Sequence, residues 1–87
     1  IRIVASQAAD ELLNVDDVDA AFVVFKTDNV MNISARSYGE LNVQLVMEEL
    51  GGGGHQTMAA AQLNDETFES TLNCLKQAID KVNEIQK

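Results

Sequence analysis

Alternating apolar and polar positions predict two strands in the first half of the chain. The run AAFVVF, from Ala20 to Phe25, is rich in the β-branched and aromatic residues expected of a buried strand. After the turn formers at 27–29, apolar and polar residues alternate from Val30 to Ala35, which is the two-residue period of a second strand. The short break between them predicts an antiparallel hairpin.

Three other segments have the three- to four-residue spacing of amphipathic helices. They cover residues 3–13, 42–50 and 66–85. Asn42 is placed to cap the second helix, and four glycines follow that helix and end it. In the third helix the lysines lie toward the carboxyl end, where the helix dipole favours positive charge.

The segment MAAAQL, from Met58 to Leu63, fits either a strand or the start of a helix, because alanine favours helix. We predict a third strand, since the turn formers Asn64 and Asp65 close the segment quickly. Strands and helices thus alternate along 87 residues, which is the length of a single domain. We therefore expect an α/β fold in residues 1–87: a small mixed sheet of three to five strands flanked by helices, with the glycine segment at one sheet edge.

Composition excludes several classes of protein. Hydrophobic residues make up 46% of the chain and charged residues 23%, as in globular domains, and no stretch approaches the roughly 20 apolar residues of a membrane span. The formal net charge of −8 argues against binding of extended DNA or RNA duplexes, which requires clustered Lys and Arg. The single cysteine, Cys74, supports neither a disulfide nor a zinc site, so we expect a core residue and a cytoplasmic setting. Because the first residue is Ile, we expect a piece of a longer chain.

Four consecutive glycines, Gly51 to Gly54, exceed what a helix stop requires, since one glycine suffices for that purpose. Such a segment can turn successive N–H groups toward an anion and let a ligand approach the backbone. His55 follows immediately and could donate a hydrogen bond to a phosphoryl oxygen. The alternative is a flexible loop whose histidine caps a neighbouring carbonyl.

Arg36 lies at the end of the second predicted strand, from which its planar guanidinium could bind a phosphate through two hydrogen bonds. Ser34 and Ser37 beside it could add hydroxyl donors. The alternative for Arg36 is an exposed ion pair with Glu40 or Glu48.

Together, ISARS at residues 33–37 and GGGGHQTMAAAQ at 51–62 resemble the DHH-associated domain of RecJ-like phosphoesterases. That family has GGGH followed by AAG, whereas this chain has AAA at 59–61 and lacks the last glycine. The segments GELNVQ and MEELGGGGHQTMAAAQL are similar to the branch of membrane-anchored cyclic-di-AMP phosphodiesterases.

The resemblance implies that an upstream DHH domain in the same polypeptide holds two manganese ions and the catalytic groups. This chain has no DHH triplet, so we expect no catalytic residue or metal ligand in it and no activity from the domain alone. Its expected role is to bind the nucleotide phosphate through Arg36, Gly52, Gly53, Gly54 and His55. Ser34 and Ser37 are weaker candidates, because hydroxyls at strand ends also satisfy turns.

The resemblance also implies a parent protein anchored in the membrane, with this domain in the cytoplasm and not itself in contact with the bilayer. Two alternatives remain at this point. One is the substrate domain of an oligoribonuclease, which degrades nanoRNA, or of a 3′-phosphoadenosine phosphate phosphatase. The other is a non-enzymatic nucleotide-binding module. The base preference, the regulatory inputs and the oligomeric state, monomer or homodimer, are left open by the sequence.

Overall fold

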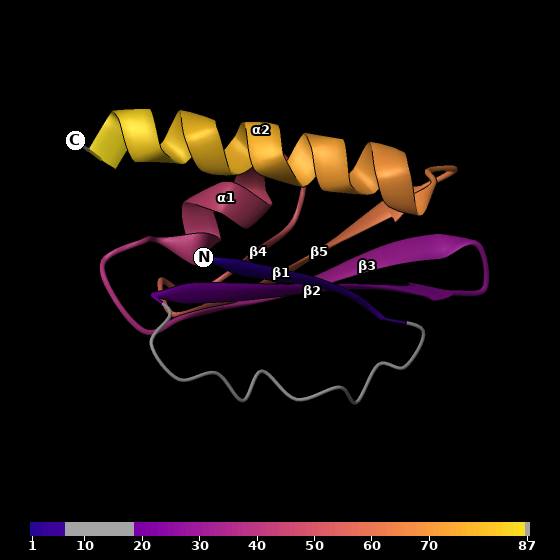
Figure 1. The fold of residues 1–87 in the computed structure, drawn as a ribbon, viewed down its shortest axis with the longest axis horizontal. Helices are drawn as coiled ribbons and strands as arrows, with labels where there is room; N and C mark the ends of the chain where they lie inside the picture. The colour runs from indigo at the N-terminus through magenta and orange to yellow at the C-terminus, as the bar shows by residue number, and fades with distance from the viewer. Residues whose placement is uncertain (7–18, 87) are drawn as a thin grey trace.

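The computed structural model describes residues 1–6 and 19–86 (Figure 1). Within them the chain forms a five-stranded mixed sheet with the strand order β1-β2-β3-β5-β4, together with two helices. The expected α/β class and the mixed sheet are thus confirmed. The elements are β1 (Arg2–Ser6), β2 (Ala20–Thr27), β3 (Val30–Ser37), α1 (Val43–Glu49), β4 (Gly53–Gly54), β5 (Met58–Asn64) and α2 (Phe68–Gln86).

The centre of the sheet is antiparallel, as the alternating pattern predicted. Strands β2 and β3 form a hairpin whose turn residues, Asp28 and Asn29, have φ values of 49° and 70°. Asp and Asn tolerate this left-handed region better than most residues, which explains their place in a two-residue hairpin turn. The predicted third strand is β5, and it pairs antiparallel with β3.

The prediction of a helix at residues 3–13 is wrong for its first part. Ile3 to Ser6 belong to β1, which pairs parallel with β2, so that Ile3 lies beside Phe22. A segment this short fits both periods, and pairing with β2 satisfies its backbone groups while Ile3 packs against the core. The rest of the predicted helix lies outside the described residues.

Both helices that the structure describes begin at side-chain caps. Asn42 Oδ1 accepts a hydrogen bond from the Leu45 N–H (3.3 Å) at the start of α1, as predicted. At the start of α2, Thr67 Oγ1 accepts from the Ser70 N–H and Ser70 Oγ accepts from the Thr67 N–H. Neither helix is long and apolar enough to cross a bilayer.

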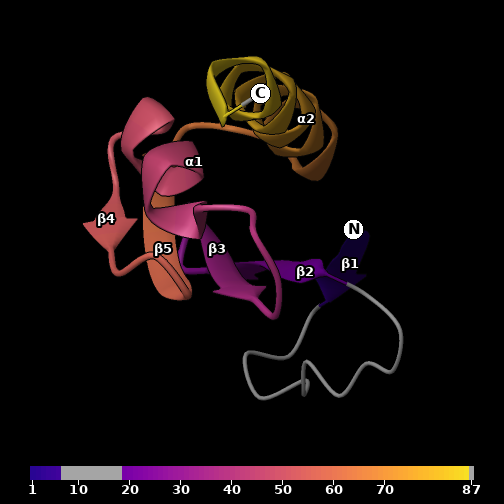
Figure 2. The same cartoon turned by 90° about the vertical axis from the view of Figure 1, so that its left-hand side faces the viewer.

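Both helices cover the same face of the sheet, which we call the helix face (Figures 1 and 2). Alternate strand residues point toward the helices and bury the core, and the intervening residues point to the opposite side, which we call the second face. The core contains Ala20, Phe22, Val24, Met31, Ile33, Ala35, Leu41, Val43, Val46, Met47, Ala59, Ala61, Leu75, Ala78, Ile79 and Val82.

Replacing the cap of α1 tests why that helix begins where it does. Asn42→Ala should lower the free energy of unfolding of the domain by about 1 kcal/mol, because the Leu45 N–H loses its acceptor. Urea denaturation measures this change. The matched control is Asn73→Ala, at an exposed position within α2, which should change stability by less than about 0.5 kcal/mol. Equal losses in the two variants would contradict the capping role.

Candidate substrate-binding site

Strand register places most of the predicted site residues on the second face, in two adjacent rows. Residues opposite each other on neighbouring strands point to the same side of a sheet. Arg36 lies opposite Met58 on β5, and Met58 exchanges backbone hydrogen bonds with His55: the His55 N–H donates at 2.7 Å and the Met58 N–H at 3.3 Å. These three residues form the first row.

The second row lies two residues further along each strand. Ser34 on β3 is opposite Ala60 on β5, and Ala60 is opposite Gly53 on β4. The two rows are separated by about 7 Å, since a strand rises by roughly 3.4 Å per residue. Arg36, His55, Ser34 and Gly53 therefore surround one patch of the second face, whose floor consists of Met58 and Ala60.

Arg36 is exposed. The alternative interpretation, an ion pair between its guanidinium and Glu40 or Glu48, is wrong, because no such pair is present among the residues that the structure describes. Nη2 of the guanidinium lies 4.0 Å from the Met58 sulfur. Two strand spacings separate the backbones of Arg36 and His55, which is about 10 Å. Both side chains are long enough to approach an anion placed above Met58 from opposite sides.

His55 lies in a turn that is tied to the body of the domain through its backbone. The Ser37 N–H donates to the Thr57 carbonyl (2.9 Å), and the Val43 N–H donates to the Gln56 carbonyl (3.1 Å). The imidazole makes no hydrogen bond with the part of the chain that the structure describes, so it does not cap a carbonyl there. The turn is fixed while the ring is exposed.

The first two glycines of the segment end α1 and do not form an anion-binding nest. Gly51 has a φ of 83°, its N–H donates to the Glu48 carbonyl (3.1 Å), and the Gly52 N–H donates to the Met47 carbonyl (2.7 Å). These two bonds define a Schellman motif. Because these amides satisfy helix carbonyls, the expectation that successive N–H groups converge on a ligand is wrong for this part of the segment.

The last three glycines of the segment, Gly52 to Gly54, differ in what a side chain would meet. A Cβ on Gly52 would lie 2.1 Å from the Ala60 carbonyl oxygen, and one on Gly54, where φ is 148°, would lie 2.5 Å from the Ala59 Cα. Both positions require glycine because the backbone packs directly on β5. A Cβ on Gly53 would have no neighbour within 4 Å. The fold therefore has no steric need for glycine at position 53.

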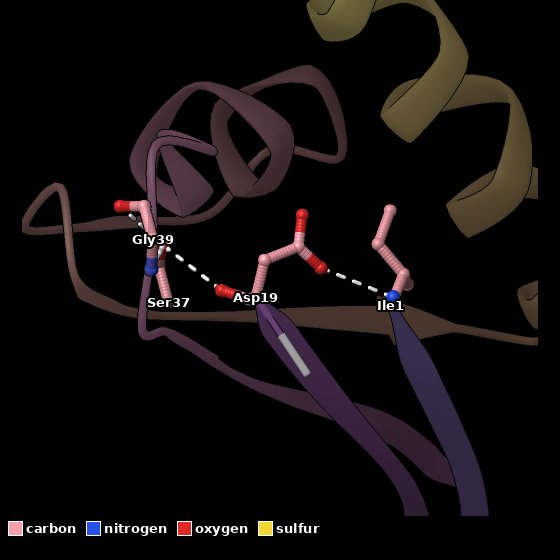
Figure 3. Close-up of polar contacts among 4 residues, drawn as sticks. All are labelled: Ile1, Asp19, Ser37 and Gly39. Atoms are coloured by element: carbon pink, nitrogen blue, oxygen red, sulfur yellow. Dashed lines mark hydrogen bonds and ion pairs between the residues drawn. The ribbon is translucent and has the colours of Figure 1, made fainter. Parts of the chain in front are cut away.

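Ser34 and Ser37 lie on opposite faces of the sheet. Ser34 is half-buried on the second face, whereas Ser37 is 6% exposed and points to the helix face. The Ser37 hydroxyl contacts the carbonyls of Asp19 (3.5 Å) and Gly39 (3.3 Å) and accepts from the Gly39 N–H (3.3 Å), as Figure 3 shows. Ser37 thus holds the turn after β3, and we do not include it in the proposed site.

An ion pair lies beside this turn, outside the two rows. The amino group of Ile1 is 3.1 Å from Asp19 Oδ1 (Figure 3), and this hydrogen bond lowers the pKa of Asp19. The Asp19 side chain is largely exposed, so the contact contributes little to stability.

A cavity of about 570 Å³ adjoins the second row. Of the predicted site residues, Ser34 and Gly52 line it, whereas Arg36, Gly53, Gly54 and His55 do not. Four polar or aromatic residues in its wall were not predicted as site residues: Phe25, Asn32, Gln62 and Asn64. The alternation from Val30 to Ala35 already placed Asn32 on the same face of its strand as Ser34. That Gln62 lies opposite Asn32 could be known only from the register of β3 and β5. The lining includes Phe25, Asn32, Ser34, Gly52, Ala60 and Gln62.

The described residues contain no group of three or more His, Cys, Asp or Glu side chains that could hold a metal ion. Cys74 is half-buried on α2, apart from the two rows. What the site offers is a guanidinium, an imidazole, a hydroxyl and an unobstructed stretch of backbone, which are groups suited to binding an oxyanion.

Comparison with known proteins assigns this architecture to a family. The model of the DHHA1 domain matches residues 2–87, so the chain belongs to the DHHA1 domain family. The solved structure of an exopolyphosphatase-related protein from Bacteroides fragilis shares the fold, with a TM-score of 0.69 and 23% identity, over 86% of this chain and 22% of that one.

Two relatives within the family are similar to this chain over most of its length. The cyclic-di-AMP phosphodiesterase PdeA of Listeria monocytogenes serotype 1/2a (strain 10403S) is 48% identical over 79 residues, which cover 90% of this chain. The cyclic-di-AMP phosphodiesterase GdpP of Bacillus subtilis (strain 168) is 48% identical over 81 residues, which cover 92%. The chain spans 12% of the length of each. The family resemblance noted in the sequence is confirmed.

The different roles of the glycines can be separated by stability measurements. Gly52→Ala should lower the free energy of unfolding by about 1–3 kcal/mol, because its Cβ would collide with the β5 backbone. Gly53→Ala, the matched control, should change it by less than about 0.5 kcal/mol, since the space is open. Urea unfolding of both variants checks the contrast. A large loss for Gly53→Ala would mean that the fold itself requires this glycine.

Proposed function

We propose that this domain binds a phosphate of cyclic-di-AMP while a DHH domain in the same polypeptide hydrolyses the phosphodiester. The identity of 48% to two cyclic-di-AMP phosphodiesterases supports the substrate class. The arrangement of the second face supports the role of this domain, because Arg36, His55 and Ser34 there are groups suited to binding an oxyanion.

Gly53 is the observation that carries the proposal. Glycine weakens a strand, and neither the φ of Gly53 nor its neighbours require it there. Gly53 faces the second face beside Ala60 and Ser34, so its missing side chain leaves room next to them. A ligand that approaches the backbone at this point would account for the glycine.

The groups around that space suit a phosphate. Arg36 would contribute a charge-assisted, bidentate contact from one side, and the His55 imidazole would donate from the other. Ser34 would donate from the second row through its hydroxyl. The N–H of Gly54 points away from β5, since ladder bonds alternate along an antiparallel pair, and it is available at the sheet edge.

The proposal divides the reaction between two domains. Two manganese ions held by the DHH domain would supply the activated water. The residues of this chain would orient the phosphate and neutralise charge that builds on its oxygens. Neutralisation by fixed donors is most effective where the site is closed from water, as between two domains.

Replacing the two first-row donors tests the phosphate contact. In the full-length protein, Arg36→Ala and His55→Ala should each lower kcat/KM for cyclic-di-AMP roughly 10- to 150-fold, as expected for loss of a charge-assisted hydrogen bond of about 1.5–3 kcal/mol. Arg36→Lys should recover only part of the loss, because an ammonium cannot form the bidentate contact. Steady-state kinetics measure these effects.

The control for charge is Lys26→Ala, at an exposed position on β2 whose register partner, Met31, lies in the core. This variant should retain the kcat/KM of the unmodified protein. If Arg36→Ala and His55→Ala also retained it, the phosphate assignment would be wrong.

A bulky residue at position 53 tests the open approach itself. Gly53→Val should reduce kcat/KM for cyclic-di-AMP by tenfold or more, because its side chain would occupy the space beside Ala60 and Ser34. The melting temperature of the domain should change little, since no atom lies within 4 Å of the new Cβ. A variant that melts much earlier, while its folded fraction remains fully active, would show that the segment serves only the fold.

A further inference from the structure

A third row of side chains lies on the second face, beyond Ser34 and Ala60. Gln62 on β5 is opposite Asn32 on β3, and Asn32 is opposite Phe25 on β2. This row is about 7 Å from the second row, given the rise of a strand. All three residues line the cavity of about 570 Å³. None of them is needed to bind the phosphate as proposed above.

Hydrogen bonds fix the orientation of the Asn32 amide. Its Nδ2 donates to Thr27 Oγ1 (2.8 Å) and to the Val30 carbonyl (3.1 Å), and a backbone carbonyl can only accept. The amide oxygen of Asn32 must therefore face the other way, toward β5. Because Asn32 is only 8% exposed, this orientation is held by its surroundings.

Asn32 in turn orients Gln62. Gln62 Nε2 donates to Asn32 Oδ1 (3.0 Å), which uses one of its two N–H groups. The second N–H and the carbonyl oxygen of Gln62 make no hydrogen bond within the described part of the chain, and the residue is exposed at the cavity. One N–H and the carbonyl oxygen of this held amide are thus left for a ligand.

That pair matches one nucleobase better than the others. A glutamine amide recognises adenine by accepting from N6 and donating to N7. Guanine presents acceptors at both corresponding positions, O6 and N7, so the Gln62 carbonyl would face a second acceptor. Phe25, half-buried in the wall of the cavity, supplies an aromatic ring of the kind on which bases stack.

We propose that this cavity binds an adenine base, read by Gln62, held in place by Asn32 and supported by Phe25. The inference rests on the proposed function, since the phosphate of the same nucleotide would lie on the first two rows. It adds that this domain distinguishes adenine from guanine, through residues distinct from the phosphate-binding ones.

The test compares cyclic-di-AMP with cyclic-di-GMP as substrates of the full-length protein. Gln62→Leu should lower the ratio of kcat/KM values, adenine over guanine, by roughly tenfold to a hundredfold, as expected for loss of a bidentate base contact. Gln62→Arg, which offers only donors, should shift the ratio further toward guanine. Phe25→Leu should lower kcat/KM for both substrates by similar factors, because stacking tolerates every base.

The matched control is Gln77→Leu, an exposed glutamine on α2, which should leave both values unchanged. An unchanged ratio in both Gln62 variants would overturn the adenine site, as would an equal loss for the two substrates. This outcome is distinguishable from failure of the phosphate proposal. Arg36→Ala and His55→Ala should lower kcat/KM for the two substrates by equal factors. If those variants matched the unmodified protein, the phosphate proposal would fail whatever the ratio.

Discussion

The position of β5 between β3 and β4 sets the register of the sheet and with it the arrangement of the proposed site. It places Met58 beside Arg36, Ala60 beside Ser34 and Gln62 beside Asn32. A slip of one residue would turn every β5 side chain to the other face, exposing Ala59 and Ala61 and burying Gln62. The cost of burying an unpaired amide in place of small apolar groups fixes the register. The rows of the proposed site follow from that register.

The glycine segment shows how four identical residues can serve different purposes. Gly51 supplies a left-handed φ that ends α1, and Gly52 and Gly54 let the backbone pack on β5 without a colliding Cβ. Gly53 alone is free of such demands. Close packing of the segment against β5 also explains why a two-residue strand persists at the sheet edge, where pairing is otherwise weak.

Because the chain as a whole is acidic, binding of a phosphate at the proposed site must depend on short-range contacts. The chain has 14 acidic residues and six Lys and Arg, so its overall field repels anions. Screening at physiological salt limits that field to about 8 Å, whereas Arg36 and His55 would act at hydrogen-bonding distance. Binding of a single phosphate at a fixed point is compatible with such an acidic surface, while binding along a nucleic acid backbone is not.

Several features could be predicted from the sequence alone: the hairpin of β2 and β3, the cap of α1, the strand at Met58–Leu63, the long α2 and the placement of the glycine segment at a sheet edge. Each depends on local patterns: alternation, side-chain caps and glycine after a helix. The sequence also indicated Arg36, Ser34 and His55, although their grouping rested on family resemblance.

Other features depend on tertiary contacts. Residues Ile3 to Ser6 form a strand because their backbone pairs with β2. Ser34 and Ser37 lie on opposite faces of the sheet because they are an odd number of positions apart along β3. The N–H groups of Gly51 and Gly52 donate to carbonyls of α1. Gln62 donates a hydrogen bond to Asn32, which lies 30 residues earlier in the chain. These outcomes depend on contacts between segments distant in the chain, and local periodicity cannot encode which distant partner satisfies a given backbone or side-chain group.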